Sequence, residues 1–441
     1  MRVSFVGSDR AADAAGQPPG CRSRLRPIMR HAVPPQAVFM KSLGVLWLVV
    51  FISLAGFGIT TIPFPFVAES MGASDFWKTF GGAGVFSLFQ LAATPLWGRA
   101  SDAYGRKPIL MLSSAGTVLA FLWLAYAPTL ESLLIARAFG GAMSGNLAAA
   151  FAYATDVTDT KNRAKGLGIV ASAFGVGFAI GPPLGGFLST LDAVPSMYWP
   201  GLASAGLSAI AFLGTVFLLP ESLPPELRKP LGKSAEPPPE GEARGPKVTP
   251  WQAFRGNPVL MGLVGASLIV AVAGGAMQSV FQFWGRDLFD YSLRDIGLHF
   301  MAFALLSAIG QAGLIGPLTR RFGEKHVAVA SIVGVTVGLA LFAMAQNDAM
   351  VWIAISLFGL ANGLFLPAIS SLVSFESDPK SRGTVMGMFN ASSSAGRIVG
   401  PALSGPIYFK LGPAAPFILS AILTAIGAVL LSRAHDKPPP S

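Results

Sequence analysis

Charged residues are scarce in this chain of 441 residues. Asp, Glu, Lys and Arg make up 12% of it, about half the share of an ordinary soluble domain, whereas 52% is hydrophobic. Mean hydropathy is +0.58. This balance excludes a disordered chain and argues against a soluble enzyme, because too few polar side chains exist to cover a water-facing surface.

Groups that carry enzyme chemistry are also missing from the sequence. Cys21 is the only cysteine, so an internal disulfide is excluded, and no Cys/His cluster has the spacing of a metal site. No glycine-rich loop followed by lysine indicates nucleotide binding. We therefore expect no metal, no cofactor and no enzymatic activity.

The chain has long uncharged runs instead. A helix needs about 20 apolar residues to cross a bilayer. Ten runs of this length contain no charged residue, and two more contain one arginine each, Arg137 and Arg397. We predict an all-α polytopic membrane protein with twelve transmembrane helices. The predicted spans are 42–68, 79–98, 108–130, 132–155, 166–191, 193–220, 256–285, 296–319, 326–347, 349–375, 383–409 and 411–432.

The lysines and arginines predict the orientation of these spans. If both termini are cytoplasmic, 26 of the 32 basic residues fall on the cytoplasmic side and 4 on the outer side. Loops that stay in the cytoplasm carry such an excess. The net charge of +10 therefore indicates topology and not a nucleic-acid partner. We expect a plasma (bacterial inner) membrane location with both termini inside.

Two polar regions divide the chain. The first is the basic N-terminal stretch, which we do not expect to be a secretory signal because it has no apolar core before the first span. The internal stretch is rich in Pro and in both signs of charge, which is typical of a linker. The predicted parts are a disordered tail 1–43, a six-helix bundle 44–220, a linker 221–257, a second six-helix bundle 258–432 and a tail 433–441.

Three short motifs recur in the two halves at an offset of 218 or 219 residues. Matching order and spacing of Asp, Lys and Arg is not explained by the general abundance of Gly and Pro in membrane helices. Internal repeats of this kind are typical of transporters. The halves are therefore predicted to be pseudo-symmetric. The paired segments are 98–107 with 316–325, 159–163 with 378–382, and 181–186 with 400–405.

On these motifs the chain resembles the major facilitator superfamily of transporters over residues 44–432. Residues 295–325 are similar to tetracycline-type efflux pumps, which belong to its drug/proton antiporter branch. One group matches the signature loop after the second helix: Gly98, Asp102, Gly105, Arg106 and Lys107. Another resembles the fifth-helix motif of antiporters: Gly177, Gly181, Pro182, Gly185 and Gly186.

The resemblance implies that the signature loop is a latch that holds one conformation. Asp102 is expected near a helix N-terminus, where the dipole favours an anion. Arg106 and Lys107 are expected to pair with carboxylates such as Asp156. The alternative is that these two cations only anchor the topology. Arg320 stands where the second half would carry the aspartate, so the latch is expected to be asymmetric.

Arg137 is the strongest candidate for a residue that faces a cavity. Placing an arginine inside a span costs at least about 2.5 kcal/mol, and such a residue usually faces a cavity or a partner. The alternative is that Arg137 extends to the membrane interface. For Arg397, support and lining roles are weighed equally. Further residues expected at the cavity are Thr60, Thr61, Asn146, Gln278, Gln282 and Asn362, beside Phe281, Phe283 and Trp284.

No acidic residue lies deep in a predicted span, although proton-coupled transporters commonly use one. His299 remains as a titratable group, or as a plain interfacial histidine. We predict a secondary transporter that exports an amphipathic small molecule, linked to protons, through alternating access. The alternatives are a facilitator or metabolite carrier without protons, and a sensory membrane protein. The expected partners are the bilayer and the small molecule, with the protein a monomer.

Overall fold

The computed structural model describes residues 36–159, 162–192, 194–228, 257–378 and 381–433. Within these ranges the chain is helical and contains no strand. The predicted tail 1–43 and linker 221–257 fall mostly outside the described residues, as does most of the predicted tail 433–441. The expectation that they are unfolded therefore stays a prediction.

The first bundle is built from helices between residues 36 and 218. Pro95 and Pro182 lie inside α5 and α9. The elements are α2 (Gln36–Thr61), α3 (Phe64–Ser70), α4 (Asp75–Thr79), η2 (Phe80–Gly84), α5 (Val85–Tyr104), α6 (Arg106–Ala125), α7 (Leu130–Met143), η3 (Ser144–Asn146), α8 (Leu147–Asp156), α9 (Arg163–Ser189) and α10 (Tyr198–Leu218).

The second bundle follows from residue 258, after a short turn η4 (Pro225–Leu227). Its first helix begins with Asn257, whose side chain accepts a bond from the Leu260 amide. The elements are α12 (Pro258–Phe289), α13 (Leu293–Ala308), η5 (Ile309–Leu314), α14 (Ile315–Phe322), α15 (Glu324–Met344), α16 (Asp348–Glu376), α17 (Arg382–Leu411) and α18 (Ala415–Ser432).

Nine of the described helical stretches are long and apolar enough to cross a membrane. The three other predicted spans coincide with α4–η2–α5, with α7–η3–α8 and with α17. The first two are interrupted by a π-helical and a 3₁₀ segment, and α17 carries many small and polar residues. The all-helical membrane fold is confirmed, and the count of twelve spans stays a prediction.

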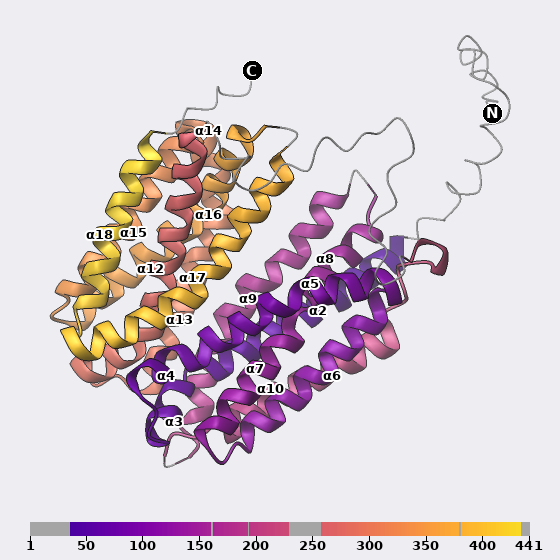
Figure 1. The fold of residues 1–441 in the computed structure, drawn as a ribbon, viewed down its shortest axis with the longest axis horizontal. Coiled ribbons are helices and arrows are strands. Elements are labelled where there is room, and N and C mark those ends of the chain that lie inside the picture. Colours follow the sequence, from indigo (N-terminus) through magenta and orange to yellow (C-terminus); the bar gives the residue numbers. More distant parts are fainter. Residues whose placement is uncertain (1–35, 160–161, 193, 229–256, 379–380, 434–441) are drawn as a thin grey trace, which may run out of the picture.

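The two bundles lean against each other at one end and diverge toward the other (Figure 1). We call the end where they diverge the linker end; it contains the turns at 104–106 and 322–324 and the ends of α8 and α16. The opposite end, which we call the far end, contains the turns at 70–75, 289–293 and 411–415. At the far end the bundles touch, since α9 packs against α13 and α17 packs against α4 and η2.

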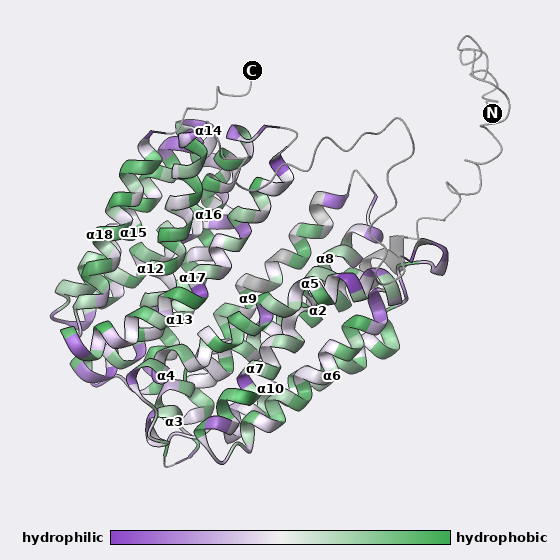
Figure 2. Cartoon of the chain, viewed as in Figure 1, coloured by the Kyte–Doolittle hydropathy of each residue, from purple (hydrophilic) through white to green (hydrophobic). Residues whose placement is uncertain are grey.

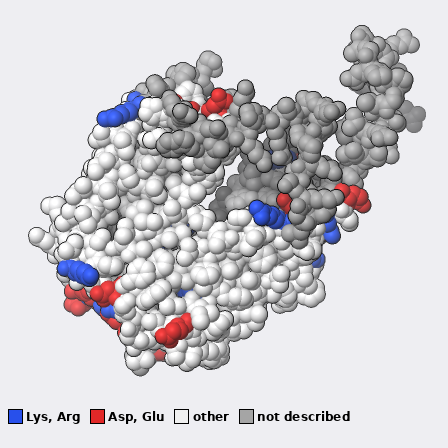
Figure 3. Space-filling view, viewed as in Figure 1, with Lys and Arg blue, Asp and Glu red and all other residues white. Residues whose placement is uncertain are grey.

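The surface between the two ends is apolar. Large hydrophobic side chains such as Phe217 on α10 and Ile422 on α18 are exposed there. The hydrophilic residues gather at the helix ends (Figure 2), and Lys, Arg, Asp and Glu leave a mostly uncharged band between them (Figure 3). Lipid would cover this band, since spanning helices satisfy their own backbone polar groups.

Candidate functional site

A cavity of about 330 Å³ lies between the two bundles. Its walls come from α9 of the first bundle and from α12, α13, η5, α16 and α17 of the second. Two smaller cavities of about 100 Å³ and 50 Å³ reach toward α2 and η2. Arg397 of α17 and Phe178 of α9 line all three. We call the three together the central cavity.

The two shared residues are counterparts in the sequence repeat. An offset of 219 residues relates Gly181 to Gly400, and the same offset pairs Phe178 with Arg397. Each therefore occupies the same place in its own half, on the helix that faces the other bundle. One position of the repeat supplies an aromatic ring and the other supplies a cation to the same space.

The walls of the central cavity are mostly apolar, with a few polar side chains. Phenyl rings come from Phe57 and Phe178 on one side and Phe303 on the other. Gln278 and Asn362 add amide groups. None of the residues lining the cavity in the described part of the chain is Asp or Glu. Such a mixture suits an amphipathic organic molecule.

The guanidinium of Arg397 is the cationic group in this cavity. Its side chain is exposed to the cavity. Its nearest polar contact is Ser394 Oγ, at the limiting distance of 3.5 Å from Nη2. No carboxylate of a described residue lies within 4.0 Å of it. Arg397 is thus a poorly partnered cation facing open space.

Arg137 differs in every one of these respects. Its side chain is 2% exposed and lines none of the three cavities. Nη1 donates to Thr60 Oγ1 at 2.9 Å, and Nη2 donates to the Thr60 carbonyl at 2.7 Å. The guanidinium also lies 5.1 Å from the Phe64 ring centre. In this structure Arg137 therefore links α7 to α2 inside the first bundle and does not face the central cavity where it was expected.

The other residues expected at the cavity are divided by the structure. Gln278 and Asn362 line the cavity of about 330 Å³, and Gln282 and Thr61 line that of about 50 Å³. Thr60 is buried against Arg137. The side chain of Asn146 lies outside the described part of the chain. The aromatic residues Phe281, Phe283 and Trp284 line none of the three cavities and pack in the core of the second bundle.

His299 is buried near the far end of α13. Its Nδ1 lies 2.8 Å from the Asp295 carbonyl, and its ring is stacked between Tyr291 and Trp352. It lines none of the three central cavities. This placement favours a packing role for His299 over contact with a transported molecule.

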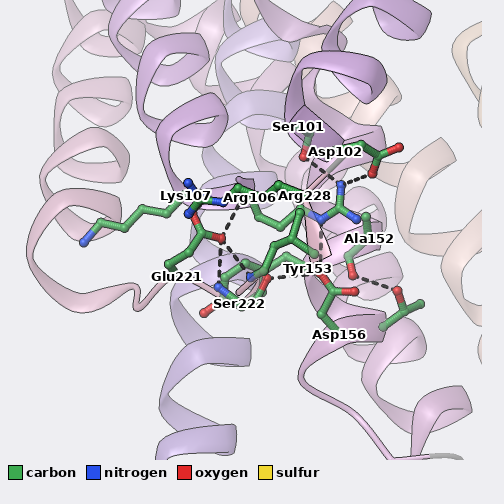
Figure 4. A network of polar contacts seen from close by, with 12 residues as sticks. Ser101, Asp102, Arg106, Lys107, Ala152, Tyr153, Asp156, Glu221, Ser222 and Arg228 are labelled. Carbon is green, nitrogen blue, oxygen red and sulfur yellow. Dashed lines mark hydrogen bonds and ion pairs between the residues drawn. The ribbon is translucent and has the colours of Figure 1, made fainter. Parts of the chain in front are cut away.

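The signature-loop residues meet at the linker end of the first bundle (Figure 4). Arg106 is at the centre: Nη1 donates to Asp102 Oδ1 at 2.6 Å, and Nε donates to Asp156 Oδ2 at 3.0 Å. Gly105 turns the chain between α5 and α6 with a φ of 107°, which a residue with a side chain rarely adopts. Arg106 therefore contacts Asp156, as expected, and also Asp102.

Glu221 is a member of this network that the sequence did not reveal. Its Oε1 accepts from the Arg106 amide at 2.9 Å, and Oε2 accepts from the Lys107 amide at 3.3 Å. A carboxylate here stabilises the free amides and positive dipole of the α6 N-terminus. Asp102 had been expected in that place; it binds the Arg106 side chain instead. We call Asp102, Arg106, Asp156 and Glu221 the latch network.

Lys107 takes no part in these ion pairs. Its ammonium donates to the Val216 carbonyl near the end of α10, at 2.8 Å. Gly98 has open space around it, since an added Cβ would meet no atom within 4 Å. Of the five signature-loop residues, only Asp102 and Arg106 therefore contribute side chains to the latch network.

The glycines of the fifth-helix motif make close backbone contacts. A Cβ on Gly181 would lie 2.7 Å from the Ala55 carbonyl oxygen of α2, and Gly177 and Gly185 also face α2. Gly186 instead meets the Leu293 backbone of α13, in the other bundle. Pro182 lines the smallest cavity. The motif therefore holds α9 tightly to its own bundle, and at Pro182 and Gly186 it also brings α9 against α13 of the second bundle.

Ion pairs and rings close the far end of the cavity. Arg286 Nη1 of α12 lies 2.5 Å from Glu69 Oε2 of α3, across the boundary between the bundles. The Arg286 guanidinium lies 5.2 Å from the Phe66 ring centre, and the Lys78 ammonium lies 4.6 Å from that of Phe409. Glu69 also pairs with Lys78 at 3.3 Å. We call this group the far-end closure.

The sequence profile of the Major Facilitator Superfamily matches residues 46–315 and 287–441. The chain belongs to this superfamily. The resemblance drawn from the motifs is thereby confirmed, and the protein is a membrane transporter of the superfamily's drug-efflux branch.

Named relatives agree with the assignment to the Major Facilitator Superfamily. The chain is 31% identical to the class C tetracycline resistance protein of Escherichia coli, over 74% of this chain and 78% of that one. Its fold is similar to the crystal structure of the human organic anion transporter MFSD10, with a TM-score of 0.65, 22% identity, and 89% and 99% of the two chains covered. A bacterial homologue of the human lysosomal transporter Spinster, in an inward-facing and occupied conformation, gives a TM-score of 0.71, 15% identity, and 89% and 96% covered.

Proposed function

We propose that this protein exports an amphipathic small molecule through alternating access of the central cavity, and that export is linked to proton movement. The supporting observation is the cavity between two pseudo-symmetric bundles, which the far-end closure seals while the bundles diverge at the linker end. Alternating access requires such a site, open to one side at a time.

The export direction is supported by two features. The class C tetracycline resistance protein, 31% identical, carries resistance in its name. The basic residues favour a cytoplasmic linker end, with the protein in the bacterial inner membrane and both termini inside. In this orientation the central cavity opens toward the cytoplasm and takes up its cargo from that side. The protein is proposed to act as a monomer.

A facilitator that works without protons is the second candidate function. One observation favours it: no Asp or Glu occurs among the described residues that line the central cavity. Coupled antiporters commonly bind substrate and proton alternately at an intramembrane carboxylate. In a proton-linked exporter without such a group, the proton would have to act on the cargo or at the bundle ends.

Flux measurements in proteoliposomes separate the two. Purified protein is reconstituted, and uptake of tetracycline and of amphipathic dyes is followed with an imposed pH gradient and after nigericin has collapsed it. Proton-linked export predicts concentrative flux only with the gradient. Flux down the cargo gradient that ignores the pH difference would instead establish the facilitator. No flux above protein-free liposomes for any compound would overturn the transport proposal.

A further inference from the structure

The most unusual feature of the central cavity is that it contains a cation, Arg397, but no Asp or Glu among the described residues that line it. Arg397 lies where the three cavities meet, between the bundles, and its best polar contact is the marginal 3.5 Å approach to Ser394. Two other arginines of the described bundles, by contrast, are bonded to protein groups. Arg137 has Thr60, and Arg286 has Glu69.

An uncompensated cation in an apolar cavity is costly, and the cost falls when an anion arrives. The cavity walls around the guanidinium are mostly apolar and offer it few groups that could replace solvating water. Ion pairs between guanidinium and carboxylate or sulfonate groups are short and directional, and they are stronger where water is scarce. A ligand that brings a negative charge therefore gains an interaction that a neutral ligand of the same shape does not.

The rest of the cavity determines the body of that ligand. The ring of Phe178 lines the space beside Arg397, and Phe303 lines the opposite wall. The amides of Gln278 and Asn362 offer hydrogen bonds next to these apolar surfaces. A volume of about 330 Å³ holds a molecule with one or a few rings.

We propose that the central cavity binds an aromatic organic anion, with its carboxylate or sulfonate on Arg397 and its rings against Phe178 and Phe303. The proposal rests on the proposed function, since it names the class of cargo for the same cavity. It assigns Arg397 as the residue that selects for charge, whereas Arg137 holds the first bundle together. The pseudo-symmetric pairing of Phe178 with Arg397 places both parts of the site at the boundary that moves.

Three probes with one aromatic body test this assignment. Dansylglycine is anionic, dansylglycinamide is neutral and dansyl-ethylenediamine is cationic, so only the charge of the tail changes. Each is titrated into the purified full-length protein in nanodiscs, and binding is followed by dansyl fluorescence. We expect dansylglycine to bind about tenfold tighter than the amide, as one added charge-assisted contact provides, with the cationic probe weakest.

Variants locate the preference. In Arg397→Gln the dansylglycine-to-amide ratio should fall to about one, while the amide binds as before, and in Arg397→Lys part of the ratio should remain. Arg433→Gln is the matched control: it removes the same charge at the exposed end of α18, far from the cavity, and should leave the ratio unchanged. Equal binding of all three probes to the unmodified protein would overturn the proposal. A preference that survives in Arg397→Gln would do so as well.

Transport of the same probes distinguishes failure of this proposal from failure of the proposed function. Flux of the amide or the cationic probe without binding preference for the anion would retain the exporter and overturn the anion site. A charge-selective site that Arg397→Gln abolishes, in a protein that moves none of the probes across proteoliposomes, would retain the site and overturn the exporter.

Discussion

The two halves of this protein use their membrane arginines in opposite ways. In the first bundle Arg137 is fully enclosed and bonded to the Thr60 side chain and carbonyl. In the second bundle Arg397 faces the central cavity, with only the distant Ser394 hydroxyl as a polar partner. Both residues look alike in sequence, as single charges inside apolar spans. Burial and hydrogen bonding, not position along the span, decide which one is available to a ligand.

The linker end shows the same division. The first bundle carries the latch network around Arg106, with carboxylates from three different segments. At the matching place in the second bundle, Arg320 and Arg321 are exposed and form no ion pair with a described residue. The first half therefore has a set of ion pairs at this end that Arg320 and Arg321 do not repeat in the second half. We infer that the first bundle moves as the stiffer body.

The largest effect is expected from joining the halves at the far end. If the bundles move as separate bodies, a bridge between Glu69 and Arg286 holds the cavity open to the linker end and abolishes transport. The experiment places Glu69→Cys and Arg286→Cys in a Cys21→Ser background and adds a short, reducible bis-methanethiosulfonate linker. Flux should stop on cross-linking and return with dithiothreitol.

Each single cysteine variant treated with the same reagent is the control for that experiment. The native side chains meet at 2.5 Å between Nη1 and Oε2, and cysteine is shorter than either of them, so a linker and not a direct disulfide is used to bridge the two positions. Full transport by the cross-linked double variant would show that transport does not require the far end to open. It would contradict the inference that the two bundles move as separate bodies.

Removing the arginines one at a time compares them directly. Arg137→Ala leaves the Thr60 carbonyl without its guanidinium donor and opens a cavity, so we expect a loss of about 2–4 kcal/mol in unfolding free energy. Arg397→Ala removes an exposed group with little bonding and should change stability by less than about 0.5 kcal/mol. Thermal unfolding of both variants in the same detergent measures the difference. Equal losses would remove the distinction between the two residues.

The sequence predicted the general arrangement better than the orientation of individual side chains. Uncharged runs and the repeated motifs were enough for the helical membrane fold and for its family, both of which are confirmed. The pairing of Arg106 with Asp156 was expected from the signature loop, whereas its pairing with Asp102 was not. Long apolar helices with a clear internal repeat are compatible with few folds and few families.

The roles of Arg137, Arg397 and Glu221 depend on information that a single sequence does not display. Rotation of a helix about its axis decides whether a mid-span arginine faces a neighbour or a cavity, and packing sets that rotation. Glu221 reaches the α6 N-terminus only because α10 ends beside it. One signal was present for Arg397: the repeat pairs it with Phe178, on the helix that carries the antiporter-type glycines.

The latch network gives the next effect in size. Arg106→Gln removes ion pairs to Asp102 and Asp156, whose side chains are 46% and 26% exposed, so solvent weakens both. We expect a loss of about 1–2 kcal/mol in unfolding free energy together with slower transport. Lys107→Gln is the matched control, because the Lys107 side chain donates to the Val216 carbonyl and only its backbone amide, which the substitution keeps, bonds to Glu221. A larger effect from Lys107→Gln would mean that topology, and not the network, determines the role of this loop.

The smallest effect tests whether the second half can be given a latch. Arg320→Asp restores an aspartate at the position that matches Asp102, but the matching position to Arg106 is Glu324, which already accepts from Ser371. The new carboxylate would face another carboxylate in place of a guanidinium, so no ion pair forms. We expect the unfolding free energy to change by less than about 0.5 kcal/mol and transport to stay close to that of the unmodified protein. Adding Glu324→Arg supplies the missing partner, and only this double variant should gain stability. Thermal unfolding of both variants checks this order, and a gain from Arg320→Asp alone would show that the second half already contains a partner for the aspartate.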